Sequence, residues 1–66
     1  MRAKVNGQER ELADSATLAD VVVGIGARVD AVAVARNGEV VPRARLAIEG
    51  VREGDVVEVI RAVGGG

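Results

Sequence analysis

Two Asn-Gly pairs, Asn6-Gly7 and Asn37-Gly38, restrict the fold of this 66-residue chain more than any other feature. Both residues of such a pair tolerate a positive φ, so the pair favours the two-residue turn of a β-hairpin. Residues 1–5 and 31–35 alternate in side-chain type, as half-buried strands do, and residues 39–41 can return from the second turn. The sequence therefore predicts two hairpins.

Two further strands are expected from the charge pattern and from a later turn. Residues 8–12 return from the first turn and are highly charged, which favours an edge position because charge discourages edge-to-edge pairing. Residues 53–55 form a turn around a glycine, and residues 56–62 follow it as the last strand. With the two hairpins, this gives about five strands.

A short helix is expected between the hairpins. Thr17, or alternatively Ser15, can cap its free N–H groups, and Asp20 places a carboxylate near the helix N-terminus. One apolar stripe follows the helical period through Leu18, Val21, Val22 and Ile25. Gly24 and Gly26 then end the helix. Because β-branched residues are poor helix formers, packing on a sheet must stabilise it.

This order of elements predicts an α+β fold of the β-grasp, ubiquitin-like type. The expected domain covers residues 1–63: a mixed sheet of about five strands, one short helix on one face, and the last strand parallel to the first at the sheet centre. A small open barrel is disfavoured by the central helix. Residues 43–50 are expected to be irregular, with Leu46 and Ile48 as buried anchors.

Composition restricts the possible functions. The chain has no Cys, no His and no aromatic residue, which leaves no thiolate nucleophile, no His base and only carboxylates for a metal. We therefore expect a protein that is not an enzyme and binds no metal. A net charge of -1 argues against nucleic-acid binding. No apolar run approaches the length of a membrane span, and no signal-peptide pattern follows Met1, so we expect a cytoplasmic protein.

Most other candidate site residues have a plain structural interpretation. The carboxylates that come in closely spaced pairs are Glu9 with Glu11, and Glu53 with Asp55. We expect them at the solvated surface, because a domain this small has little room for a catalytic pocket. Gly24 and Gly26 follow a helix, whereas a phosphate-binding loop precedes one. Arg43 and Arg45 are expected to be solvated.

The glycine run Gly64, Gly65 and Gly66 allows two interpretations. It can be a frayed terminus with no role. It can also be a flexible tail that threads a channel too narrow for side chains, so that its α-carboxylate becomes the reactive group once activated as an acyl-adenylate. In the second case the chain is a macromolecular substrate and needs no catalytic side chain.

The sequence resembles the ThiS family of thiamine-biosynthesis sulfur carriers over nearly its whole length. Residues 5–7 resemble the opening turn of that family, and residues 34–43 resemble its central segment. Residues 53–59 resemble the turn into the last strand, and residues 65–66 the reactive Gly-Gly end. Leu46 departs from the family pattern, which often has a bulky aromatic there; the change concerns core packing.

The resemblance implies a mechanism and partners. A ubiquitin-activating-like, ATP-dependent adenylyltransferase would adenylate the Gly66 carboxylate, with no cofactor bound to the chain itself. A cysteine desulfurase or other persulfide donor would supply the sulfur, and thiazole synthase would use the resulting thiocarboxylate. Two alternatives stay open: the small subunit of molybdopterin synthase or another sulfur carrier or protein modifier, and a ubiquitin-like interaction module with an inert tail.

The last strand also suggests a docking surface. Val57 and Val59 share one face, so Glu58 and Ile60 share the other. An unpaired buried carboxylate is very costly, so the Glu58 face should be the open one. Ile60 is then exposed near the tail, a candidate anchor for partner enzymes with Glu58 and Arg61 at its rim. The alternatives are an incidental surface Ile60 or a bulge that turns it inward.

Overall fold

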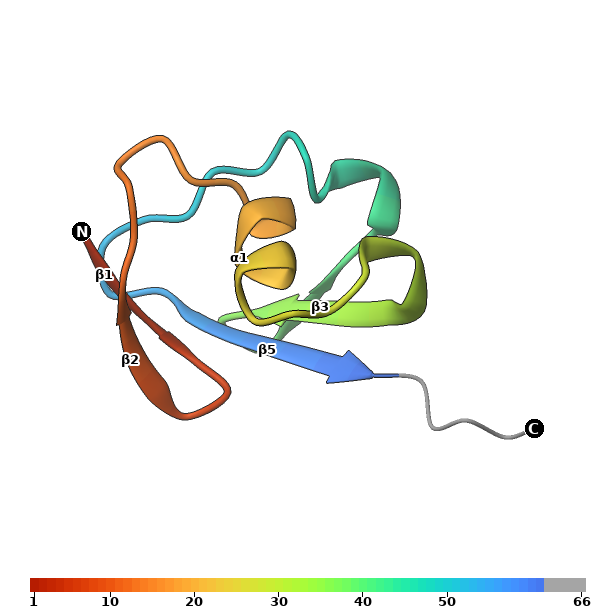
Figure 1. Cartoon of the computed structure of the whole chain (residues 1–66), viewed down its shortest axis with the longest axis horizontal. Helices are drawn as coiled ribbons and strands as arrows, with labels where there is room; N and C mark the ends of the chain where they lie inside the picture. The colour runs from red at the N-terminus through yellow and green to blue at the C-terminus, as the bar shows by residue number, and fades with distance from the viewer. Residues whose placement is uncertain (62–66) are drawn as a thin grey trace.

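The computed structural model describes residues 1–61, in which one α-helix lies above a sheet (Figure 1). In chain order the elements are β1 (Arg2–Val5), β2 (Gln8–Glu11), α1 (Leu18–Gly24), the 3₁₀ turn η1 (Val29–Ala31), β3 (Val32–Arg36), β4 (Glu39–Val41), the 3₁₀ turn η2 (Arg43–Arg45) and β5 (Val56–Arg61). Within the described residues the sheet has five strands in the order β2-β1-β5-β3-β4. Strand β5 is parallel to β1 and antiparallel to β3. This mixed sheet confirms the predicted β-grasp; four of the expected strand boundaries, in β1, β2 and β3, shift by one residue.

Both Asn-Gly pairs form the expected tight turns. Asn6 and Gly7 have φ values of 50° and 82°, and Asn37 and Gly38 have 51° and 85°. These left-handed conformations match the twist of an antiparallel hairpin, and the turns join β1 to β2 and β3 to β4. The charged strand β2 lies at a sheet edge, as its composition predicts.

Helix α1 begins with a capping box. The backbone N–H of Asp20 donates to Thr17 Oγ1 at 3.2 Å, and the backbone N–H of Thr17 donates to Asp20 Oδ2 at 2.9 Å. Thr17, and not Ser15, is therefore the N-cap. Gly26, one residue after the C-cap Ile25, has a φ of 81° and ends the helix as predicted.

The loop after η2 supplies two more caps to the helix N-terminus. The N–H groups of Leu18 and Ala19 donate to the carbonyl oxygens of Glu49 and Leu46, at 3.0 and 2.9 Å. Leu46 is 1% exposed and belongs to the core, as expected. Ile48 is 64% exposed, so its expected burial is wrong. The carbonyl groups of Leu46 and Glu49 face the helix, and the Ile48 side chain between them is left outside.

The core lies between the helix and one face of the sheet. It consists entirely of aliphatic side chains, as the absence of aromatic residues requires: Ala3, Val5, Leu18, Val21, Val22, Val32, Val34, Leu46, Val51, Val57 and Val59. β-Branched valines pack well on a pleated surface, so they suit the sheet side of this core. No helix in residues 1–61 is long and apolar enough to cross a membrane.

Candidate functional site

A small network of side-chain hydrogen bonds holds the beginning of strand β5. The Asn37 side chain accepts a hydrogen bond from the Val56 N–H at 2.9 Å and donates one to Asp55 Oδ1 at 3.1 Å. Asp55 Oδ2 also accepts the backbone N–H of Arg52 at 2.9 Å. Asp55 is only 7% exposed, so its expected place at the solvated surface is wrong. The two hydrogen bonds compensate the burial of its carboxylate.

The first Asn-Gly turn fastens β5 from the other side. Asn6 Oδ1 accepts the backbone N–H of Val59 at 2.8 Å, and the Asn6 N–H donates to the carbonyl oxygen of Val57 at 2.9 Å. Both asparagines thus serve as turn residues and as side-chain partners of β5. The sequence indicated only the first role, because nothing local shows that the turns flank the same strand.

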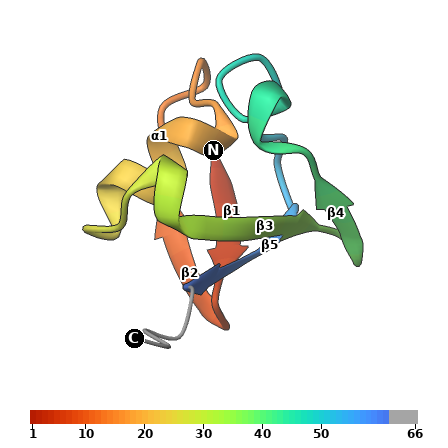
Figure 2. The ribbon, with the colours of Figure 1, turned by 90° about the vertical axis from the view of Figure 1, so that its right-hand side faces the viewer.

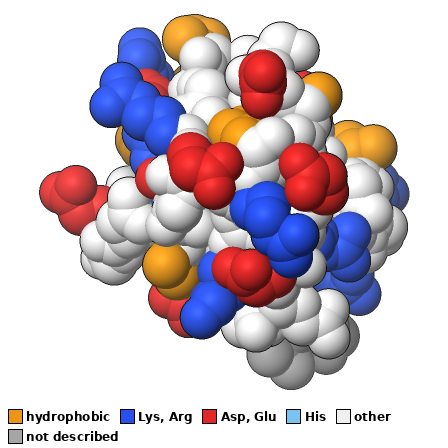
Figure 3. All heavy atoms as spheres, turned by 90° about the vertical axis from the view of Figure 1, so that its left-hand side faces the viewer, with side chains coloured by type: hydrophobic (Ala, Val, Ile, Leu, Met, Phe, Trp, Pro, Cys, Tyr) orange, Lys and Arg blue, Asp and Glu red, His pale blue; other side chains and the backbone are white. Residues whose placement is uncertain are grey.

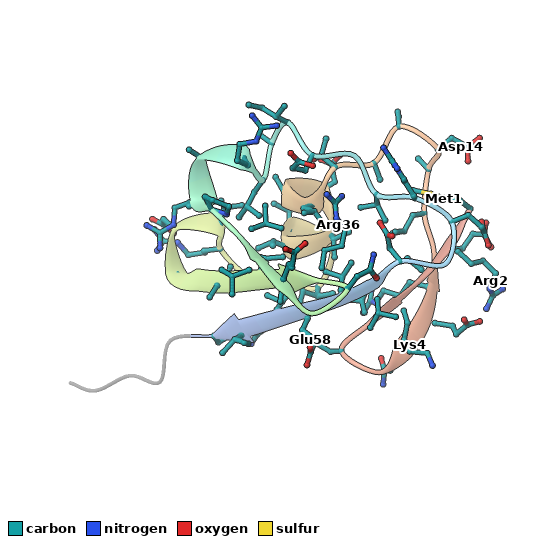
Figure 4. The ribbon with its side chains drawn as sticks, turned by 180° about the vertical axis from the view of Figure 1, so that it is seen from behind. Met1, Arg2, Lys4, Asp14, Arg36 and Glu58 are labelled. Atoms are coloured by element: carbon teal, nitrogen blue, oxygen red, sulfur yellow. The ribbon has the colours of Figure 1, made fainter. Side chains whose placement is uncertain are left out.

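The side chains of β5 alternate between the two faces of the sheet. Val57 and Val59 are buried, whereas Val56, Glu58 and Ile60 are exposed, Ile60 by 59%. Figure 4 shows Glu58 pointing away from α1. The expected exposure of Glu58 and Ile60 is confirmed. In register they lie beside the small side chains of Ala35 and Ala33 in β3, so Ile60 stands out from this face.

Arg61 belongs to the opposite side from Ile60. It pairs with Val32 in the sheet register, and its Nη2 donates to the carbonyl oxygen of Ile25, the C-cap of α1, at 3.2 Å. A cation at this end of a helix also interacts favourably with the helix dipole. Two open hollows of about 260 and 300 Å³ share Val32 and Arg61 in their lining. Figure 2 faces this end of β5.

An exposed ion pair lies beside these hollows. Arg28 donates to both carboxylate oxygens of Asp30, at 3.1 and 2.8 Å. Hydrogen bonds from Arg28 lower the pKa of Asp30, and the charge of Arg43 lowers it further. Asp30 therefore carries its negative charge among these arginines at neutral pH.

A second ion cluster joins β3 to the loop that caps the helix. Arg36 Nη2 donates to Glu49 Oε1 at 2.8 Å, and Arg45 Nη2 donates to Glu49 Oε2 at 2.7 Å. Arg45, expected to be merely solvated, is therefore paired. Hydrogen bonds from Arg45 and then from Arg36 lower the pKa of Glu49.

The remaining carboxylates of the closely spaced pairs lie at the surface and contact Arg2. Glu9 and Glu11 are exposed and lie within 3.4 and 3.8 Å of the Arg2 guanidinium. Glu53 is exposed and accepts the Arg2 N–H at 2.9 Å. The expected surface position is confirmed for these three. In the described part of the chain, no three acidic residues come together as a metal site would require.

Gly64, Gly65 and Gly66, the residues predicted to form the reactive tail, lie outside the described residues, as do Ala62 and Val63. Their flexibility and the reactivity of the terminal carboxylate stay predictions. The described part of the chain ends at Arg61, whose contacts are given above.

A mixed five-stranded sheet with a parallel central pair and one helix across it defines the ubiquitin-like β-grasp class of proteins. Within that class, this chain belongs to the ThiS family, whose family model matches residues 3–66.

Solved structures agree with this assignment. The crystal structure of the thiamine biosynthesis protein ThiS from Geobacter metallireducens is 32% identical, covers both chains completely and superposes with a TM-score of 0.81. The NMR solution structure of a thiamine biosynthesis protein from the same organism has a TM-score of 0.80 at 32% identity, over all of this chain and 88% of that one.

A further relative is a much longer protein. It is a thiazole synthase from Paramagnetospirillum magneticum, 36% identical over all 66 residues of this chain. The chain spans only 20% of the length of that relative, so the match concerns one part of a larger protein.

Proposed function

We propose that this chain is a sulfur carrier of thiamine biosynthesis whose Gly66 carboxylate is the group that reacts. The observation that carries the proposal is the match of the ThiS family model, which extends through the terminal glycines to residue 66. The likeness to two thiamine biosynthesis structures favours this pathway over the molybdopterin alternative. The name of the longer relative, a thiazole synthase, belongs to the same pathway.

The chemistry would proceed by activation and substitution at the chain end. A free carboxylate is a poor electrophile, so an adenylyltransferase would first join it to the α-phosphate of ATP and release pyrophosphate. A persulfide sulfur from a cysteine desulfurase or related donor would then displace AMP, and a thiol would cleave the S–S bond to leave the thiocarboxylate. Thiazole synthase would take up that sulfur. The chain itself acts as a co-substrate and not as an enzyme, consistent with its lack of Cys and His.

Intact mass spectrometry tests this function directly. After incubation with the adenylyltransferase, ATP and a sulfur donor, the chain should gain the mass difference between one sulfur and one oxygen. A variant that lacks Gly65 and Gly66 should keep its melting temperature, because glycines contribute no side-chain packing, and should gain no mass. A truncated variant that still acquires sulfur would show that the terminal carboxylate is not the reactive group.

We further propose that Ile60 anchors the partner enzymes, with Glu58 and Arg61 at its rim. Ile60 is exposed beside the small Ala33 side chain and lies one residue before the end of β5. An apolar side chain in such a position is suited to fill a pocket of a partner. Arg61 would contact the partner from the helix side of the strand, since its Nη2 reaches Ile25.

Substitution of Ile60 by Asp separates docking from folding. Ile60→Asp should leave the melting temperature almost unchanged and weaken binding to the adenylyltransferase. Ile48→Asp is the matched control, because Ile48 is 64% exposed and lies in a loop outside the sheet. Equal binding by the two variants would argue against an anchor at Ile60, and a large loss of stability in Ile60→Asp would show that Ile60 is part of the core.

A further inference from the structure

The end of the molecule at which β5 finishes has an excess of positive charge. Arg28, Arg43 and Arg61, here called the tail-root arginines, lie around the two hollows that meet at Val32. Asp30 is the carboxylate in this group, and Arg28 already binds it. Within residues 1–61, no carboxylate lies within salt-bridge distance of Arg43 or Arg61.

The rest of the chain has an excess of negative charge. Apart from the tail-root arginines and Asp30, the chain carries six basic and nine acidic side chains. Figure 3 faces the other end of the molecule, where red carboxylates and blue basic side chains alternate. There Arg2 lies within ion-pair distance of both Glu9 and Glu11. A chain with a net charge of -1 therefore presents a local net charge of +2 where its last strand ends.

The length of the tail limits which groups of a partner enzyme the tail-root arginines can interact with. Five residues separate Arg61 from Gly66, so a fully extended tail would place the carboxylate up to about 17 Å beyond Arg61. That distance exceeds the Debye length of about 8 Å at physiological ionic strength. A nucleotide at the reactive carboxylate would thus be out of range of the tail-root arginines, whereas a protein surface at the mouth of the channel would be within range.

We propose that the tail-root arginines bind an acidic, carboxylate-rich surface of the adenylyltransferase around the entrance of the channel that receives the glycine tail. This inference rests on the proposed function. Opposite charges at this one end attract the carrier in the productive orientation, and the acidic excess elsewhere repels the same surface in other orientations. Such complementarity acts mainly on the association rate and on specificity.

Charge reversal tests the proposal with the full chain and the adenylyltransferase, without ATP or sulfur. Arg43→Glu and Arg61→Glu should each weaken binding on the order of tenfold at low salt. Arg52→Glu is the matched control: Arg52 is exposed, makes no ion pair within the described residues and precedes β5 instead of ending it. Asp30→Asn, which removes the negative charge among the tail-root arginines, should tighten binding.

Salt provides a second readout that a folding defect would not reproduce. Raising the ionic strength from 0.1 to 1 M shortens the Debye length from about 10 to about 3 Å, so the difference between the tail-root variants and Arg52→Glu should shrink. The proposal is overturned if the unchanged chain does not bind, if Arg52→Glu loses as much affinity, or if Asp30→Asn weakens binding. Thermal unfolding of each variant excludes loss of fold as the cause.

The proposed function is judged by a separate measurement. At saturating carrier concentration, the unchanged chain and Arg52→Glu should both form the thiocarboxylate, whatever the charge at the end of β5 contributes to binding. Weakened binding of Arg43→Glu and Arg61→Glu, together with normal sulfur transfer by the unchanged chain, supports both proposals. Normal charge-dependent binding with no mass gain in any variant would overturn the sulfur-carrier function and leave the acidic docking surface standing.

Discussion

The two ends of strand β5 are held in different ways. At its beginning, the Asn37 side chain accepts the Val56 N–H and donates to the buried Asp55, and Asn6 accepts the N–H of Val59 farther along the strand. At its end, the exposed Ile60 stands out from the sheet, and Arg61 reaches only the carbonyl of Ile25 by a side-chain hydrogen bond. The side-chain hydrogen bonds to the backbone of β5 thus lie at Val56 and Val59, before the last two residues of the strand. Substitutions at the beginning of β5 should reduce the stability of the fold. Substitutions at its end should weaken binding to partner proteins.

The largest effect is expected from the core under the beginning of β5. Val57 is 0% exposed, and Val57→Ala should lower the free energy of unfolding by about 2–3 kcal/mol through lost burial and the cavity it leaves. Ile60→Ala, on the same strand but 59% exposed, should change it by less than about 0.5 kcal/mol. Urea unfolding of both variants measures the contrast. Similar losses would mean that the two ends of β5 are equally integrated in the fold.

A smaller effect is expected from Asp55. Asp55→Ala removes the acceptor of the Arg52 N–H and of the Asn37 amide, so the free energy of unfolding should fall by about 1–2 kcal/mol. Sulfur transfer by the folded variant should be unchanged, because Asp55 lies at the opposite end of β5 from the tail. Glu53→Ala, which removes an exposed carboxylate of the same turn with its single exposed hydrogen bond from the Arg2 N–H, is the comparison for stability and should cost less. Lost transfer in folded Asp55→Ala would contradict the separation of the two ends.

The two roles of Asn37 can be separated by two substitutions. Asn37→Gly keeps the positive φ of 51° accessible but removes both side-chain hydrogen bonds, and it should cost about 1 kcal/mol. Asn37→Ala loses the same hydrogen bonds but keeps a Cβ in the left-handed region, which only Gly adopts without steric cost, so it should be less stable than Asn37→Gly. Chemical denaturation compares them. Equal stability of the glycine variant and the unchanged chain would show that the hydrogen bonds to β5 contribute nothing.

The smallest expected effect is the loss of stability at acidic pH that comes from the Glu49 carboxylate. Arg36, which donates to Glu49, faces Val57 in the sheet register, so this ion pair belongs to the fastened end of β5. Folding lowers the pKa of Glu49 below its ordinary value of 4.5. The pair therefore contributes stability above about pH 4.5, and that contribution is lost as the pH falls through the lowered value.

Melting temperatures between pH 6 and pH 3 check this expectation in two variants. Glu49→Gln should reduce the acid-induced decrease in melting temperature. Asp30→Asn should reduce it less, because its partner Arg28 is only two residues away and can remain close in the unfolded chain. A larger effect of Asp30→Asn would place the stronger ion pair at the end of β5 and contradict the comparison.

Much of the fold could be predicted because its signals are local. The two Asn-Gly turns, the start of the helix near Thr17 with Asp20 in its first turn, and the alternation of Val57 with Glu58 depend on neighbouring residues, whose φ preferences and hydrogen bonds act over a few positions. The exposure of Ile60 followed from the same alternation and from the cost of burying Glu58. The proposed reactive end was likewise predicted from composition, since glycines and a carboxylate remain when other reactive groups are absent.

Only the tertiary structure decided which segments meet. Leu46 and Ile48 look alike in sequence, yet one is buried and the other exposed, because carbonyl groups of the loop cap a helix distant in the chain. Asp55 is buried because the turn at Asn37 brings an amide to it. The positive charge at the end of β5 likewise arises from arginines on three separate segments. Local preference cannot predict such encounters, since their energy arises only when the sheet and helix have already packed together.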